Sequence, residues 1–194
     1  MRATTSSSWR TVDIVVAAAI AVAFGVVFWA WGFLWAATAP AFTFLPPAQY
    51  LISGLWLVAG IVGALVIRRP GAALFTETVA AIVSVLLGSQ WSLDTVTSGV
   101  IQGLGAEIVF AAFAYRSWTL GTATLAAVVS AIGEWLHDMY FYYPDVGLGG
   151  WLVFLVFMIA SAVAIAGIGG WYLTRALAES GVLAPFPSGR RGGA

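Results

Sequence analysis

The chain has 194 residues, of which 61% are hydrophobic and 8% are charged, and its eight basic residues balance eight acidic ones. A composition this apolar, with a mean hydropathy of +0.97, excludes an ordinary soluble core and indicates a protein whose solvent is lipid. The balanced charge gives no case for nucleic-acid binding. The absence of cysteine excludes disulfides, thiolate metal sites and cysteine nucleophiles.

Six apolar stretches follow one another along the chain, each near the ~20 residues that a ~30 Å hydrocarbon layer requires. They cover residues 12–36, 48–67, 72–89, 95–114, 119–142 and 149–174. We therefore predict an all-α integral membrane protein with six transmembrane helices in a single domain, residues 1–184. The polar, Gly-rich residues 185–194 are expected to form a disordered cytoplasmic tail.

The basic residues, all of them arginine, fall on one alternate set of connecting segments. They lie before the first stretch, between the second and third, between the fourth and fifth, and after the last: Arg2, Arg10, Arg68, Arg69, Arg116, Arg175, Arg190 and Arg191. The opposite loops carry only the acids Asp94 and Asp145. By the positive-inside rule, both termini are expected in the cytoplasm.

Five ionisable side chains fall well inside the predicted spans, away from their ends, where each costs a few kcal/mol. They are Glu77, Glu107, Glu134, His137 and Asp138. Helical spacing places Ser130, Glu134, His137, Asp138 and Phe141 on one stripe, which is expected to face a polar cavity. No arginine is available in the outer half to neutralise Glu134, and this favours a cationic or amine-bearing ligand or a protonated carboxyl group. The structural alternative is that His137 and Asp138 form an ion pair at the membrane surface, which only ends the helix and binds no ligand.

Gln102 is expected near the depth of Glu134, but it lies ~140° around its helix from Glu107, so the two should not serve one site. A structural and a functional role stay equally open for Glu107, which could partner Glu77 or an arginine. Most tryptophans and tyrosines lie at span ends and are typical of an interfacial belt. Trp56 lies about two turns inside its span and is expected to stack on a ligand.

Small residues line two helix faces, Ala17 with Ala21 in the first span and Gly99 with Gly103 in the fourth. Such faces allow close helix approach. For Gly99 and Gly103 we expect packing within the bundle. For Ala17 and Ala21, packing and a partner contact are equally favoured.

Three segments resemble the YkoE family, the substrate-binding S components of energy-coupling factor (ECF) vitamin transporters. They are RRPGAALFTETVAAIVSVLLGSQW (residues 68–91), GVIQGLGAEIVFAAFAYR (residues 99–116) and ALAESGVL (residues 176–183). The resemblance covers essentially the whole chain. It implies a multi-pass subunit of a bacterial cell membrane that binds thiamine or its hydroxymethylpyrimidine precursor, without a cofactor or enzymatic activity of its own. The implied partners are a transmembrane coupling subunit, two cytoplasmic ATPase subunits and membrane lipid.

The family pattern matches this chain at Glu77, Gln102, Glu107, Asp138 and the Gly54–Trp56 segment. The chain departs from the pattern at Ser84, where the family often has a second acid. Glu134, on the neighbouring helix, could take the place of that acid. Combining this pattern with the residue chemistry, we expect a pocket in the outer half, between the fourth, fifth and sixth helices, and no metal. The expected substrate contacts are Trp56, Glu77, Ser84, Gln90, Trp91, Gln102, Glu134, His137, Asp138 and Tyr143. Ala17 and Ala21 are similar to the AxxxA surface through which S components contact the coupling subunit.

Two other classes of function remain as alternatives. A proton-coupled transporter of small cations would use Glu77 or Glu134 as its exchange acid, but the two halves show no repeat of the kind such transporters carry. An intramembrane enzyme is less favoured still. A serine–histidine hydrolase would need a serine within reach of the single histidine, His137, and its own helix supplies none. A di-metal carboxylate site would need two Glu-x-x-His motifs, and the chain has only the one at Glu134 and His137.

Overall fold

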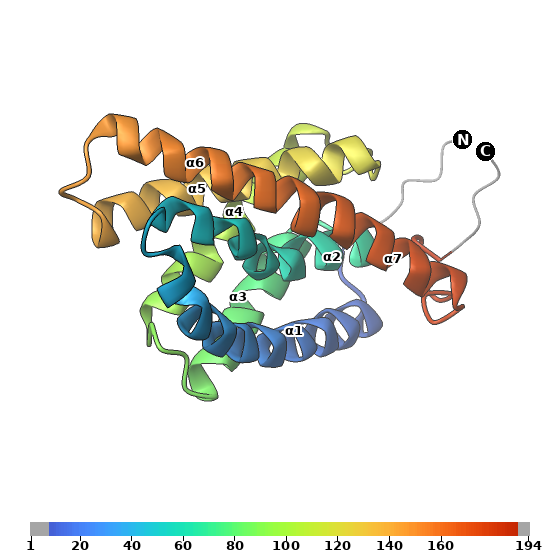
Figure 1. Cartoon of the computed structure of the whole chain (residues 1–194). Coiled ribbons are helices and arrows are strands. Elements are labelled where there is room, and N and C mark those ends of the chain that lie inside the picture. Colours follow the sequence, from blue (N-terminus) through green and yellow to red (C-terminus); the bar gives the residue numbers. More distant parts are fainter. Residues whose placement is uncertain (1–7, 190–194) are drawn as a thin grey trace.

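The computed structural model describes residues 8–189, which form a bundle of helices with no strand among them. The α-helices are α1 (Thr11–Thr38), α2 (Val58–Ile67), α3 (Ala72–Leu86), α4 (Asp94–Ala112), α5 (Leu120–Tyr142), α6 (Leu148–Ser161) and α7 (Gly170–Glu179). The 3-10 segments η1 (Ala39–Phe42) and η2 (Pro46–Leu57) connect α1 to α2, and the π-helical segment η3 (Ala162–Gly169) joins α6 to α7 in one rod (Figure 1). These units follow the six apolar stretches, so the all-α prediction is confirmed.

Four of the described helical units are long and apolar enough to cross a membrane: Thr11–Phe42, Pro46–Ile67, Asp94–Ala112 and Leu148–Glu179. The apolar helix α3 has only 15 residues. The longer helix α5 carries the acids Glu134 and Asp138. The number of membrane crossings therefore stays a prediction at six.

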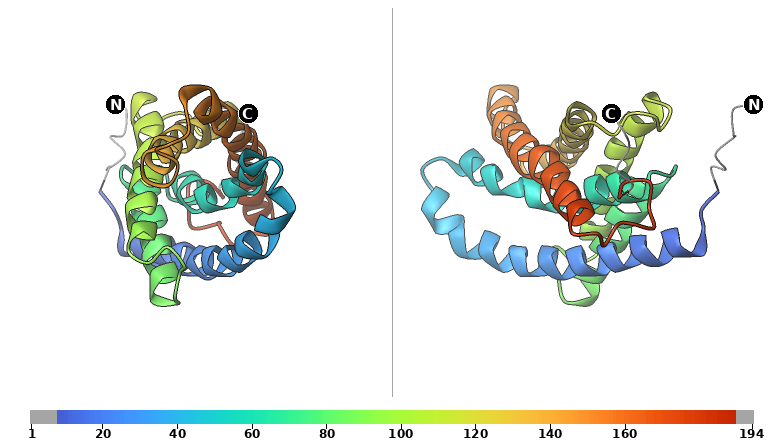
Figure 2. Two further views of the ribbon diagram at one scale, coloured as in Figure 1. Left: turned by 60° about the vertical axis from the view of Figure 1, so that its left-hand side comes forward. Right: turned by 90° about the vertical axis from the view of Figure 1, so that its right-hand side faces the viewer.

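Helix α2 lies in the middle of the bundle, and all ten of its residues are buried. The view along the bundle shows the other helices as a ring around it (Figure 2). Its sequence, VAGIVGALVI, has no polar side chain. A helix that is apolar on every side is typical of a core position, and α2 is the central, buried helix of the bundle.

Small residues let α1, α3 and α4 approach one another closely. A Cβ added to Gly103 of α4 would lie 2.9 Å from the Cα of Leu74, and one added to Gly99 would lie 2.5 Å from the Cβ of Ala81. These two glycines pack within the bundle, as predicted. Ala17 and Ala21 of α1 are also fully buried within the chain, with 0% exposure. This corrects the prediction that they contact a partner subunit, because their small side chains already face neighbouring helices.

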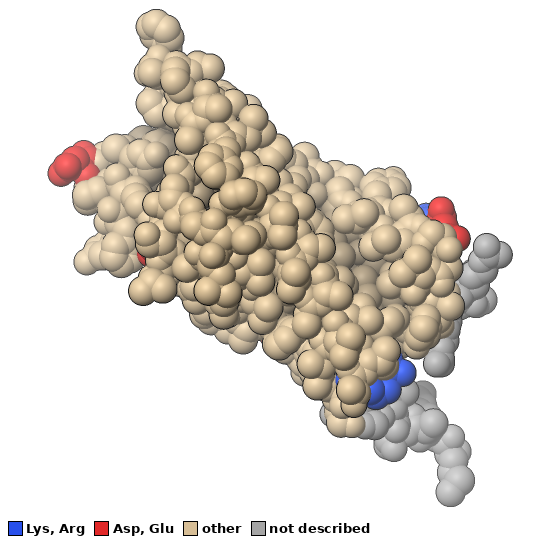
Figure 3. Space-filling view, turned by 90° about the horizontal axis from the view of Figure 1, so that it is seen from below, with Lys and Arg blue, Asp and Glu red and all other residues tan. Residues whose placement is uncertain are grey.

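The two ends of the bundle differ in charge. α1 begins and α7 ends at the same end of the molecule (Figure 1). We call this the arginine end, because it carries Arg10, Arg68, Arg69, Arg116 and Arg175. In the space-filling view, the visible arginines lie at one end and most of the remaining face is uncharged (Figure 3). Arg2, Arg190 and Arg191 lie outside the described residues.

The first part of the C-terminal tail packs against the bundle instead of being disordered as expected. Phe186 is only 2% exposed, and the Arg10 guanidinium lies 5.9 Å from the centre of its ring. The hydroxyl of Ser188 donates to the carbonyl of Val66 at 2.9 Å. The buried Phe186 side chain and the Ser188 hydrogen bond thus hold residues 185–189 against the bundle. Residues 190–194 lie outside the described part.

Candidate functional site

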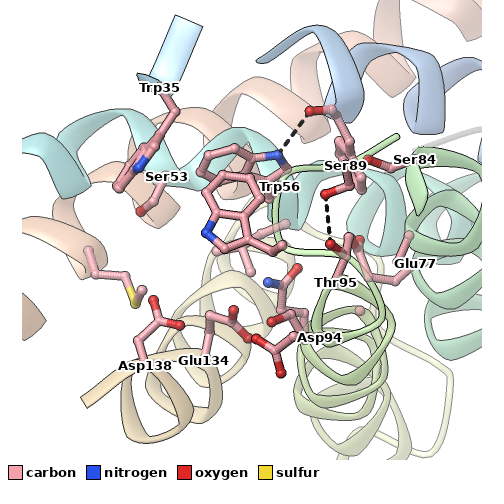
Figure 4. Close-up of a pocket in the computed structure, with 18 of the residues that line it drawn as sticks. Trp35, Ser53, Trp56, Glu77, Ser84, Ser89, Asp94, Thr95, Glu134 and Asp138 are labelled. Carbon is pink, nitrogen blue, oxygen red and sulfur yellow. Dashed lines mark hydrogen bonds between the residues drawn. The ribbon is translucent and has the colours of Figure 1, made fainter. Parts of the chain in front are cut away.

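A cavity of about 330 Å³ lies toward the end opposite the arginines, between α1, η2, α3, α4 and α5 (Figure 4). It is lined by Phe28, Trp35, Tyr50, Ser53, Trp56, Leu57, Glu77, Ala81, Ser84, Ser89, Trp91, Asp94, Thr95, Ser98, Gly99, Gln102, Glu134, Asp138, Tyr142, Tyr143 and Met158. Only Met158 comes from α6. The predicted location between the fourth, fifth and sixth helices is therefore corrected: α1, η2 and α3 line the cavity together with α4 and α5.

Three tryptophans form one wall of the cavity. The ring centre of Trp56 lies 5.2 Å from that of Trp35 and 5.2 Å from that of Trp91, the second pair meeting edge to face at 87°. The indole N–H of Trp56 donates to the carbonyl of Phe28 at 3.3 Å, which ties the ring to α1. The wall is therefore a fixed aromatic surface, made by residues from three separate segments.

Carboxylates line the cavity on α4 and α5. The Tyr50 hydroxyl donates to Asp138 Oδ2 at 2.9 Å. His137 lies behind this surface, with Nε2 3.1 Å from Asp94 Oδ1 and Nδ1 3.4 Å from Asp138 Oδ1. The Tyr142 hydroxyl also donates to Asp94. The imidazole thus holds Asp94 and Asp138 in place from outside the lining.

Two buried acids of the cavity each have one oxygen without a partner among the described residues. Glu134 is 8% exposed, and its Oε2 accepts no hydrogen bond. Glu77, on α3 and 1% exposed, accepts from the backbone N–H of Gly60 through Oε2 at 2.5 Å, but its Oε1 has no partner. Leaving a buried carboxylate oxygen unbonded is costly. None of the described arginines lines this cavity, so the pattern favours a ligand that brings hydrogen-bond donors or positive charge.

Glu107 has a different environment, which answers the question left open by the sequence. Its carboxylate accepts from the backbone N–H groups of Gly71 at 2.5 Å and Ala73 at 3.0 Å, at the start of α3. The Tyr115 hydroxyl donates to it at 2.8 Å. Burial and then this hydrogen bond raise the pKa of Tyr115 to about 12, so the hydroxyl keeps its proton near neutral pH. Glu107 caps a helix and does not line the cavity.

Eight of the ten predicted contacts line the cavity: Trp56, Glu77, Ser84, Trp91, Gln102, Glu134, Asp138 and Tyr143. Gln90 does not, because its amide donates to the carbonyl of Gly32 at 3.1 Å and ties a loop to α1. His137 is displaced behind the wall, as described above. Binding of a ligand by the eight residues stays a prediction.

Sequence reasoning missed several lining residues, chiefly Tyr50, Asp94 and Ser98. Asp94, Ser98 and Gln102 are spaced four residues apart, so they share one polar face of α4. This spacing in the sequence could have predicted that Asp94 and Ser98 line the same cavity as Gln102. Tyr50 and Trp35 carried no such signal, since tyrosine and tryptophan at span ends are ordinary belt residues.

One group within the site has the composition of a metal site. Glu134, His137 and Asp138 offer ligand atoms within 4.8 Å of one another. A carboxylate–imidazole set of this kind suits a divalent ion such as zinc or cobalt. Both imidazole nitrogens already face carboxylates, however, so a metal would have to displace at least one of these contacts.

An apolar helical bundle with an aromatic and acidic cavity toward one end has the features of a substrate-binding membrane subunit. The fold is similar to that reported as "Crystal structure of an S-component of ECF transporter", with a TM-score of 0.90 and 33% sequence identity over 94% of this chain and 92% of that chain. The fold is thus that of an ECF S component.

Sequence comparison narrows this class. The chain is 34% identical over 177 residues to YkoE of Bacillus subtilis (strain 168), a candidate HMP/thiamine permease protein, with 91% of this chain and 88% of that protein covered. Residues 12–133 match a family described as the permease component of an ABC-type cobalt transport system. The chain belongs to the YkoE family. It is a multi-pass protein of a bacterial membrane, and its relatives are transport subunits, which excludes the enzyme alternative.

Proposed function

We propose that this chain is the substrate-binding subunit of an ATP-driven ECF importer and captures thiamine or its hydroxymethylpyrimidine precursor on the outer side of the membrane. The observation that carries the proposal is the pairing, in one cavity, of a tryptophan wall with acids that no basic lining residue neutralises. Thiamine is an aromatic cation with an aminopyrimidine ring, so its rings suit the tryptophans and its charge and amine suit the acids. The name of the Bacillus subtilis relative points to the same ligand class.

In this proposal the groups of the cavity have distinct tasks. Glu134 and Asp138 accept hydrogen bonds from the ligand amine and balance its charge. The amide of Gln102 bonds the edge of the pyrimidine ring, and Trp56 or Trp91 stacks on a ring face. Glu77 lines the cavity from α3, beside α4, where its unbonded oxygen can take a second donor from the ligand or from water.

The proposal also requires an orientation. With six crossings and both termini in the cytoplasm, the cavity opens outward and the arginine end faces the coupling subunit and its ATPases. Reporter fusions at Pro46 and Asp145 should report outside, and fusions at Arg69 and Arg116 should report inside. The reverse pattern would place the cavity on the cytoplasmic side and contradict capture from outside.

Ligand binding can be tested on the purified chain alone. Thiamine and hydroxymethylpyrimidine are titrated while tryptophan fluorescence is followed, first with the parent and then with Glu134→Gln. We expect quenching by at least one compound and a weaker response in the variant, because one charge-assisted hydrogen bond is lost. Asp145→Asn, in an exposed loop, is the matched control and should bind like the parent. No quenching and no heat of binding with either compound would refute the assignment.

A divalent metal ion is a second candidate cargo, favoured by the Glu134–His137–Asp138 group and by the description of the matching family. The tryptophan wall argues against it, since a metal ion gains nothing from an aromatic surface of this size. Calorimetric titration with Co²⁺ in the absence and presence of thiamine separates the two cargoes. Tight Co²⁺ binding without any thiamine binding would replace the vitamin with the metal.

A further inference from the structure

A second, smaller cavity of about 160 Å³ lies at the arginine end, and it shares no lining residue with the ligand cavity. It is bounded by the end of α2, the segment before α5, and α7. Arg68, Trp118, Trp171, Thr174, Arg175 and Ser188 line it, together with apolar side chains. Two cationic and two indole groups thus meet around one hollow.

Arg68 has no carboxylate within ion-pair distance among the described residues, which include all eight acids of the chain. Its Nε donates to the carbonyl of Leu65 at 3.2 Å, and its guanidinium lies 5.7 Å from the centre of the Trp118 ring. The remaining guanidinium nitrogens have no acceptor in the described part of the chain. Burial lowers the pKa of Arg68, as expected for a cation that lacks an anion.

The surrounding groups complete a donor set. Trp118 is held by a stacked contact with Phe110, at 5.1 Å between ring centres. Arg175 lies 5.6 Å from the centre of the Trp171 ring and pairs with the exposed Glu179 at 3.0 Å. Neither the Trp118 nor the Trp171 indole N–H donates a hydrogen bond within the described residues, and both residues line the cavity.

The position of the cavity indicates where its anion comes from. Arginine and tryptophan at the end of a membrane bundle lie at headgroup level, and basic pockets between helices there bind acidic lipid headgroups. On α7, Tyr172 and Leu173 beside the cavity are 57% and 41% exposed, as suits a lipid-facing surface. We propose that this cavity binds the phosphate of an acidic phospholipid, with Arg68 and Arg175 as the cationic contacts and the two indoles as flanking donors.

The test uses the full chain in neutral detergent. Phosphatidylglycerol, phosphatidylcholine and inorganic phosphate are each titrated, lipid retention is counted by native mass spectrometry, and thermal stabilisation is measured in parallel. We expect preferential retention of phosphatidylglycerol and about a fivefold weaker affinity in Arg68→Gln, and likewise in Arg175→Gln. Arg175→Gln alters an exposed residue and keeps the test valid if Arg68→Gln fails to fold. Arg116→Gln, exposed and outside the cavity, should retain lipid like the parent.

Three outcomes would overturn the proposal. Equal phosphatidylglycerol affinity in the parent and in both cavity variants would show that the arginines contribute nothing. Stabilisation by inorganic phosphate alone, with no preference for phosphatidylglycerol over phosphatidylcholine, would make the site one for a free anion. Unchanged lipid retention with lost co-purification of a coupling subunit would make the cavity a protein contact.

Discussion

The arginine end and the cavity end of the bundle treat buried acids in opposite ways. At the arginine end, Asp13 pairs with Arg10 at 2.6 Å and lies 3.7 Å from Arg69, and Glu107 accepts backbone and tyrosine donors. At the cavity end, Glu77 and Glu134 each keep an oxygen that has no partner in the described part of the chain. A carboxylate whose lone pairs are satisfied within the chain stabilises the fold, whereas an unsatisfied one beside a cavity is available to a ligand. From this contrast, and not from depth in the membrane, we infer that Glu77 and Glu134 are the acids that serve a ligand.

Glu107→Ala should sharpen the comparison most strongly. The substitution removes the acceptor of the N–H groups at the start of α3 and of the Tyr115 hydroxyl. We therefore expect the folded state to lose about 4 kcal/mol of stability. A fall in the melting temperature measures this loss, and Glu107→Gln, which keeps one acceptor, should fall less. Melting like the parent, combined with lost thiamine binding, would assign Glu107 to the ligand site instead.

Ala17→Trp tests whether the packing near the arginine end is as tight as described. Ala17 is 0% exposed, so an indole at this position must push helices apart, at a cost of about 3 kcal/mol. Ala19→Trp, on the exposed side of α1, is the matched control and should melt like the parent. If Ala17→Trp also melted like the parent while uptake failed, the original prediction of a partner contact would be restored.

Glu134→Gln tests the other half of the comparison. Because its Oε2 is unbonded, losing the charge should leave the melting temperature unchanged or raise it. Thiamine affinity should fall by about ten- to a hundredfold, equivalent to roughly 1.5 to 3 kcal/mol. A variant that melts lower yet binds normally would make Glu134 a structural acid, and the contrast between the two ends would fail.

Tyr50→Phe should have the smallest effect. It removes the hydroxyl that donates to Asp138 at 2.9 Å while keeping the ring in the wall. Without this bond Asp138 is less well oriented, and we expect a loss of about 1 kcal/mol in binding, roughly fivefold in the dissociation constant. Calorimetry of the parent and the variant measures it. An effect as large as that of Glu134→Gln would show that the tyrosine hydroxyl contacts the ligand directly.

The sequence was sufficient for the helices because length and apolarity are local properties. It also found Glu77, Glu134 and Asp138, since a charge inside an apolar run is conspicuous in any fold. It could not assign Glu107, because the amides that it caps come from Gly71 and Ala73, more than thirty residues away. Ala17 and Ala21 show a related limit: small residues predict a close neighbour but do not say which helix supplies it.

The 3-10 winding of η2 has a geometric consequence for the cavity. With three residues per turn, side chains at i, i+3 and i+6 eclipse one another. Tyr50, Ser53 and Trp56 have this spacing, and all three border the cavity. In an α-helix, three residues turn through ~300°, so Tyr50 and Trp56 would diverge by ~120° and could not share one straight column. The ring, hydroxyl and indole therefore line up because the backbone at this point is wound more tightly than the helix that follows it.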